Sequence, residues 1–215
     1  MRHDRRAILG LGAAGLGSAL LSGCGVSNIL AGPAPDLYVL SPKSTFPEDL
    51  PSVNWQLVVE EPSAARGLDT DRIAIAPTDL EVKYFPEARW ADRAPRMVQS
   101  LIIQSFENSK RIVSVGRQQL GLRSDFVLKS ELREFQAELR KEGPRVRVRL
   151  NLKLVRPLEG VILASQTFEA IKPTQSDKVA DVVAVFDDAT GSVLKRAVTW
   201  ALTEGAKAGP SRFDR

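Results

Sequence analysis

The run "RVRVRLNLKLV" (residues 145–155) shows the clearest strand periodicity in the chain. It follows "SDFVLKSELREFQAEL" (residues 124–139) after the short segment "RKEGP" (residues 140–144). Two long runs separated by a few residues that include glycine predict a β-hairpin. Because successive strand side chains point to opposite faces, one set in residues 145–155 faces the core and the other faces outward. The inward set is Val146, Val148, Leu150, Leu152 and Leu154; the outward set is Arg145, Arg147, Arg149 and Lys153.

The segments around this hairpin alternate between strand-like and helix-like patterns. Apolar spacing predicts helices over residues 94–108 and 177–204, the first with Pro95 in its opening turn. Further strands are predicted at residues 37–40, 55–60, 71–76, 81–85, 111–115 and 161–171, with Pro86 ending the fourth. Strands and two helices without strict alternation predict an α+β fold. We expect a single domain with a largely antiparallel or mixed β-sheet and two main helices packed on one face.

The outward arginines of the hairpin have two interpretations. A row formed by Arg145, Arg147 and Arg149 could bind anionic lipid headgroups or an acidic partner protein. The neighbouring run carries Glu131, Glu134 and Glu138, so the same cations could pair with carboxylates across the strands. The amino-acid pattern leaves both interpretations open.

A second candidate surface lies in "DLEVKYFPEARWADRAPRMVQ" (residues 79–99), where three aromatic residues surround a proline. Tyrosine, tryptophan and arginine are the most frequent anchors of protein interfaces, so Tyr84, Arg89 and Trp90 are candidate partner-binding residues. The alternative is an edge strand whose aromatic side chains cover the mouth of the core. Both interpretations remain open.

The amino-terminal segment predicts export and lipid attachment. Arg2, Arg5 and Arg6 precede an uncharged run, residues 7–21, that is shorter than the roughly 20 residues of a membrane-spanning helix. The sequence "LSGC" (residues 21–24) then resembles the bacterial lipobox and contains the chain's one cysteine. This pattern predicts a signal peptide at 1–23, lipid attachment to Cys24, a flexible tether at 24–36, a folded domain at 37–207 and a disordered tail at 208–215. The lipid groups would anchor the protein to a membrane.

Several function classes are disfavoured by composition. The one histidine, His3, lies inside the predicted signal peptide, which leaves no base for a nucleophilic hydrolase. Adjacent carboxylates such as Asp187–Asp188 and Glu60–Glu61 point apart on a helix or strand, so they do not form a catalytic pair. The "GLGAAG" motif (residues 10–15) lacks the preceding strand of a dinucleotide fold.

Loss of residues 1–23 also lowers the net charge from +4 to about +2, because lysine plus arginine falls from 30 to 27 and aspartate plus glutamate from 26 to 25. We therefore expect no catalytic residue, metal, cofactor or nucleic-acid partner.

Ordered segments of the chain resemble the ABC-type transport auxiliary lipoprotein family, which includes the lipoprotein of the paraquat-inducible system. The resemblance rests on "RIAI" (72–75), "VKYF" (82–85), "ARWAD" (88–92), "SDFVL" (124–128), "ELREF" (131–135), "PRVRVRLNLKLV" (144–155) and "VVAVFDDATGSVLKRAVTW" (182–200). Phe85 departs from the family, where a second tyrosine is common.

This resemblance implies a non-enzymatic accessory lipoprotein of a transporter built from an MCE-domain protein, a permease and an ATPase. Such systems are thought to move phospholipid or other hydrophobic molecules between two membranes. Gly25, in place of the aspartate that retains lipoproteins at the inner membrane, fits anchoring in the outer membrane on its periplasmic side. A homo-oligomer is compatible with this role. The alternative function is a periplasmic carrier module that itself encloses an acyl chain.

Overall fold

The computed structural model describes residues 34–118, 124–140 and 143–208. The folded unit begins at Pro35. Its elements follow the order β1 (Asp36–Tyr38), β2 (Val53–Val59), β3 (Ser63–Ala64), β4 (Arg72–Thr78), β5 (Glu81–Trp90), α1 (Ala94–Ser109), β6 (Ile112–Gly116), β7 (Phe126–Arg140), β8 (Gly143–Arg156), β9 (Val161–Pro173) and α2 (Val179–Lys207). Cys24 and the predicted signal peptide lie outside the described residues, as does most of the predicted tether and of the predicted tail.

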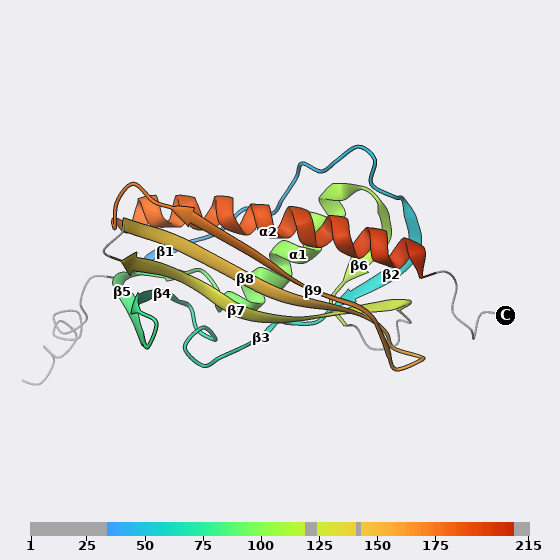
Figure 1. Cartoon of the computed structure of the whole chain (residues 1–215), viewed down its shortest axis with the longest axis horizontal. Coiled ribbons are helices and arrows are strands. Elements are labelled where there is room, and N and C mark those ends of the chain that lie inside the picture. The colour runs from blue at the N-terminus through green and yellow to red at the C-terminus, as the bar shows by residue number, and fades with distance from the viewer. Residues whose placement is uncertain (1–33, 119–123, 141–142, 209–215) are drawn as a thin grey trace, which may run out of the picture. The chain divides into compact units, whose positions relative to one another are not determined.

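Strand β7 organises the sheet, as Figure 1 shows along the middle of the unit. One edge of β7 pairs antiparallel with β8 over its whole length, and β8 continues into an antiparallel pair with β9. The other edge of β7 pairs in parallel with three strands in turn: β2 at 126–128, β3 at 131–132 and β4 at 136–138. Beyond these strands, β6 pairs with β2, while β5 pairs with β4 and β1 with β5. The sheet of the described residues is therefore mixed, and the predicted α+β class is confirmed.

The predicted hairpin is present, and the structure gives its register. Glu138 lies opposite Arg145 and Glu134 opposite Arg149. At the end of the turn, Gly143 has a φ of 116°, a conformation that side-chain-bearing residues rarely adopt. The glycine of "RKEGP" is therefore what allows the two long strands to join at this point.

Two details of the prediction were wrong. Strand β5 does not end before Pro86 but continues to Trp90. Pro86 is tolerated because the β4–β5 ladder is irregular there: Tyr84 pairs with Ala74, whereas the next paired residue is Arg89, opposite Arg72. Proline is compatible with such a bulge because its missing N–H interrupts no ladder hydrogen bond. The two-residue strand β3 was missed, since so short a segment has no periodicity.

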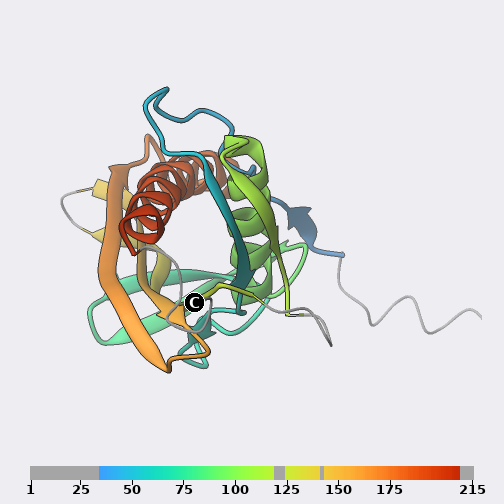
Figure 2. The same cartoon turned by 90° about the vertical axis from the view of Figure 1, so that its right-hand side faces the viewer.

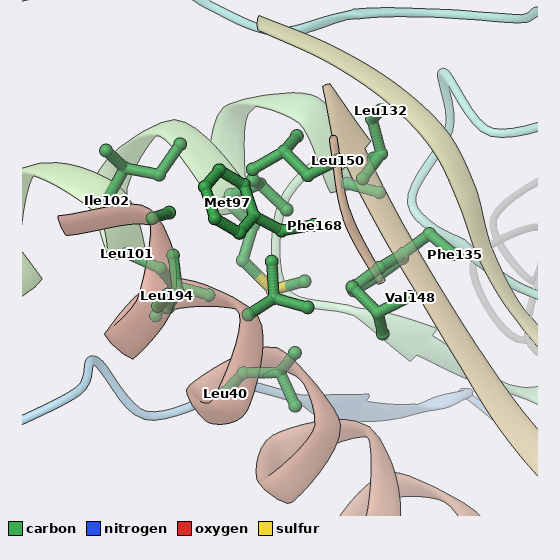
Figure 3. Packing of buried hydrophobic residues seen from close by; sticks show 14 of the residues in the cluster. Leu40, Met97, Leu101, Ile102, Leu132, Phe135, Val148, Leu150, Phe168 and Leu194 are labelled. Carbon is green, nitrogen blue, oxygen red and sulfur yellow. The ribbon is translucent and has the colours of Figure 1, made fainter. Parts of the chain in front are cut away.

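Both helices cover the same side of the sheet, with α2 lying along β8 and β9 (Figures 1 and 2). Between the layers, apolar side chains from α1, α2 and the long strands point toward one another, as Figure 3 shows for Met97, Phe168 and Leu194. All five inward residues of the hairpin are at most 2% exposed. Burial of each large apolar side chain stabilises the fold by about 1.5–3 kcal/mol.

Candidate interaction surface

The register of the sheet brings both candidate surfaces onto its outer face, opposite the helices. Tyr84 on β5 lies opposite Ala74 on β4, which pairs with Gln136 on β7. Gln136 in turn lies opposite Arg147 on β8, and Arg147 lies opposite Ile171 on β9. Since paired residues point to the same face, these five residues form one row across the sheet. We call this the outer-face row.

The arginines beside this row are paired with carboxylates. Glu138 is only 1% exposed, and Arg145 Nε donates a hydrogen bond to its Oε2 at 2.5 Å. Arg147 lies 3.2 Å from the other oxygen of Glu138 and 3.4 Å from Glu169. Arg149 pairs with Glu134 in the same manner. Cross-strand pairing is therefore the interpretation that the structure supports, because Arg145, Arg147 and Arg149 each have a carboxylate partner.

Tyr84 and Arg89 occupy the β4–β5 part of the outer face. The guanidinium of Arg72 stacks 3.8 Å above the centre of the Tyr84 ring, and the Tyr84 hydroxyl donates to the Gly67 carbonyl at 3.1 Å. Arg89 donates to both oxygens of the Asp71 carboxylate, at 3.0 and 3.2 Å. Both side chains of that pair are about two-fifths exposed, so they remain accessible to a partner.

Trp90 does not belong to this surface, and its prediction as a contact residue was wrong. The side chain is 1% exposed and packs edge-on against Phe186, with a centroid distance of 5.2 Å. The ring of Phe135 on β7 also packs against Trp90, with a centroid distance of 5.5 Å. Because strand residues alternate, Arg89 faces outward and Trp90 faces the core. The alternative interpretation, an aromatic that closes the core, is the one that holds for Trp90.

Sequence reasoning missed Arg72, Gln136 and Ile171. The sequence around Arg72 does not indicate a role in this surface, because Arg72 meets Tyr84 only through the pairing of β4 with β5. Ile171 is 42% exposed and becomes relevant because the β8–β9 register sets it beside Arg147. A register prediction for these strands would have been needed to find them.

A second charged cluster joins the start of α1 to the segment before β4. Arg93 donates to Asp69 through Nε at 2.9 Å and to Glu61 at 3.0 Å. The hydrogen bond to Asp69, followed by the negative charges of Asp69 and Glu61, raises the pKa of Arg93 above its ordinary value. This cluster ties the start of α1 to the segments before β3 and β4.

The two members of each adjacent carboxylate pair have different partners. Asp187 accepts a hydrogen bond from the backbone N–H of Ser41 at 2.6 Å, whereas Asp188 pairs with Lys172. In the other pair, Glu60 lies 3.1 Å from Lys129, whereas Glu61 binds Arg93. Within residues 34–118, 124–140 and 143–208, no group of three or more histidine, cysteine or acidic residues is arranged to hold a metal ion.

A surface pocket of about 390 Å³ is lined by residues of β3, β7, β8 and the segment between β2 and β3. Its lining is polar or charged throughout: Glu60, Glu61, Ser63, Lys129, Ser130, Glu131, Asn151 and Lys153. Such a lining does not suit an acyl chain, which needs apolar contacts. The helix–sheet interface is filled by side chains such as Phe135 and Phe186, whose rings lie 5.0 Å apart. Neither observation favours the carrier-module alternative.

Family comparison matches residues 38–198 to the ABC-type transport auxiliary lipoprotein component family. The chain belongs to this family. Membership makes it a lipoprotein with an auxiliary role in ABC-type transport, which fits a protein that is not an enzyme. Among the described residues, no helix is long and apolar enough to cross a membrane.

Two individual relatives can be compared with this chain. A crystal structure of a DUF330 protein from Xanthomonas campestris is 33% identical, covers 80% of this chain and 98% of that protein, and superimposes with a TM-score of 0.76. An uncharacterized protein of Bradyrhizobium diazoefficiens is 28% identical over 151 residues. The match takes in 70% of this chain but spans only 40% of that relative's length.

Proposed function

We propose that this family member is an outer-membrane-anchored periplasmic lipoprotein that serves an ABC transporter of the MCE type. In that role it is a non-enzymatic accessory component, and the transporter moves phospholipid or other hydrophobic molecules between the two membranes. Family membership over residues 38–198 is the observation that carries the proposal. The lipobox ending at Cys24 and the glycine that follows it supply the anchor and its destination.

The chain divides by role in this proposal. Residues 1–23 are the signal peptide, and residues 24–36 form the lipidated tether. Residues 37–207 form the auxiliary domain, and 208–215 is a disordered tail. The domain binds the MCE-domain protein or the permease–ATPase complex, and it does so as a monomer or as a homo-oligomer.

We propose the outer-face row, apart from the buried Ala74, and its flanking arginines as the docking surface. Tyr84 supplies an aromatic ring already held by Arg72, and Arg89 supplies a guanidinium held in place by Asp71. Both groups are preorganised, so a partner need not restrict their rotamers, and this lowers the entropic cost of association. Arg145, Arg147 and Arg149 add charged groups whose carboxylate partners leave the face close to neutral. Such a surface fits a protein partner with mixed polar and apolar contacts better than a purely anionic one.

Co-purification tests the transporter assignment. The lipidated protein is solubilised in mild detergent after crosslinking, and its partners are identified by mass spectrometry. We expect an MCE-domain protein, with or without permease and ATPase. Consistent failure to recover any of these proteins would contradict the assignment.

Site-specific photo-crosslinking tests the docking surface separately. A photoreactive residue replaces Ile171, which is 42% exposed and lies in the row. The matched control replaces Val113, which is 70% exposed on β6, away from the row. We expect the partner to be captured from position 171 and not from 113. Equal capture at both positions would contradict this choice of surface while leaving the transporter assignment intact.

A further inference from the structure

The β4–β5 turn presents an uncovered leucine. Thr78 pairs with Glu81, so Asp79 and Leu80 are the two turn residues between them. Leu80 is 99% exposed and Val82, just beyond it, is 52% exposed. Turns of this length usually carry glycine, asparagine or aspartate for conformational reasons, none of which calls for a leucine side chain. The side chain at the tip is therefore available for a contact outside the domain.

Strand β1 sets the direction in which the chain enters the folded unit. Strand β1 runs parallel to β5, with Asp36 opposite Ala88 and Tyr38 opposite Trp90. Strand β5 starts at Glu81, directly after the turn. Of the two ends of β1, the N-terminal one is therefore nearer the Leu80 tip, and the chain enters β1 from that direction.

Chain length allows the tip to reach the anchoring membrane. Arg89 pairs with both Arg72 on β4 and Leu37 on β1. Arg72 is six residues before Thr78 on β4, so β1 lies about 20 Å from the turn at the rise of a strand. Twelve residue steps separate Cys24 from Asp36 and span at most about 40 Å. The segment from Cys24 to Asp36, when extended, is therefore about twice as long as the distance from β1 to the Leu80 tip.

We propose that the β4–β5 tip is a second membrane contact, with Leu80 and Val82 entering the phospholipid surface in which Cys24 is held. This inference rests on the proposed lipidation of Cys24. Among the described residues, the charged groups next to Leu80 are paired within the domain, Asp79 with Arg140 and Glu81 with Lys83 at 2.9 Å. The contact is therefore apolar rather than dependent on anionic lipid.

The effect of such a contact is to orient the domain. A fully buried leucine shifts partitioning between water and an apolar phase by about 10- to 100-fold. That shift adds little to the membrane affinity that several acyl chains already give the protein. It is enough, however, to favour one orientation of the tethered domain relative to the membrane. The β8–β9 turn, which lies about 35 Å away at the other end of β7, would then point into the periplasm.

Fluorophore depth in the lipidated full-length protein tests this inference. Leu80→Cys and, as the matched control, Leu158→Cys are each labelled with an NBD fluorophore; Leu158 lies in the β8–β9 turn and is 51% exposed. Lipidation consumes the Cys24 thiol, so only the introduced cysteine reacts. The proteins are reconstituted in vesicles of phosphatidylethanolamine and phosphatidylglycerol, with or without brominated acyl chains.

We expect a label at position 80 to show blue-shifted emission, to be quenched by brominated chains and to be protected from aqueous iodide. A label at 158 should show the opposite behaviour. On protein whose lipidated N-terminus is verified by mass, equal behaviour of the two labels would overturn this inference alone. A blue shift at 80 that appears only after addition of transporter proteins would assign the tip to a protein partner and also overturn it. An unmodified N-terminus would overturn the anchor and this inference together.

Discussion

Replacement of Gly205 by alanine should destabilise the domain, although the same change elsewhere in α2 should stabilise it. A Cβ added at Gly205 would lie 2.5 Å from Cζ2 of Trp55, 3.0 Å from Cε2 and 3.3 Å from Cη2. The shortest of these distances is well below van der Waals contact, so the ring or the helix must move. At Gly191 an added Cβ would meet only Cδ of Lys43, at the ordinary distance of 3.8 Å.

The expected magnitudes follow from two opposing terms. Alanine in place of helical glycine stabilises by about 0.5–1 kcal/mol. Overpacking of a filled core costs about 1–3 kcal/mol. Gly191→Ala should therefore raise the free energy of unfolding by the first amount, whereas Gly205→Ala should lower it by about 1 kcal/mol. The helix term is common to both variants, so their difference of about 1–3 kcal/mol measures the clash with Trp55.

Urea denaturation followed by far-ultraviolet circular dichroism measures this difference, with unchanged slopes showing that the same surface is exposed. A Trp55→Phe change completes a double-mutant cycle. It should cost less in the Gly205→Ala variant than in the unsubstituted protein, because the smaller ring relieves the clash. If Gly205→Ala is as stable as Gly191→Ala, the reasoning is refuted, since the close approach of α2 to Trp55 would then not require glycine.

Three further predictions concern the candidate surface and the core beneath it. Trp90→Ala should lower the free energy of unfolding by about 3–5 kcal/mol in urea denaturation, because the side chain is almost fully buried; a loss below about 1 kcal/mol would contradict its placement in the core. Glu138→Gln should cost about 1.5–3 kcal/mol because its buried carboxylate binds charged donors, whereas Glu131→Gln, whose side chain is 50% exposed, should cost less than about 1 kcal/mol. Equal losses in the two variants would show that burial does not distinguish them. Tyr84→Phe should cost about 0.5–1.5 kcal/mol by loss of the hydrogen bond to Gly67, and partner crosslinking from position 171 should be retained because the ring remains.

Local patterns predicted most of the secondary structure because strand and helix periodicity depend on neighbours in the chain. The helix predicted over residues 94–108 spans Ala94–Ser109, and the hairpin strands appear with their inward residues buried. The predicted end of β5 before Pro86 was wrong. Proline usually ends a strand, whereas here a bulge in the β4–β5 ladder accommodates it. That bulge depends on a partner strand, which no local pattern shows.

The candidate surface could be predicted only in part. Tyr84 and Arg89 were identified by residue type, and the structure places both on the outer face. Trp90, one residue further on, was grouped with them by the same reasoning but lies in the core. Residue type indicates what a side chain can bind, but the strand's two faces decide whether a partner can reach it.

The hairpin could be predicted from the amino-acid sequence alone, and the lipid anchor at Cys24 is likewise a prediction from sequence alone. The lipobox is a contiguous signal, and the alternation of residues 145–155 needs no tertiary contact to be recognised. The choice between an open cationic stripe and paired arginines required the folded sheet, because it depends on register: Glu138 and Glu134 lie opposite Arg145 and Arg149. The sheet also set the direction of β1, whose N-terminal end points toward the Leu80 tip, since the direction of one strand relative to another is a property of their pairing and not of either segment.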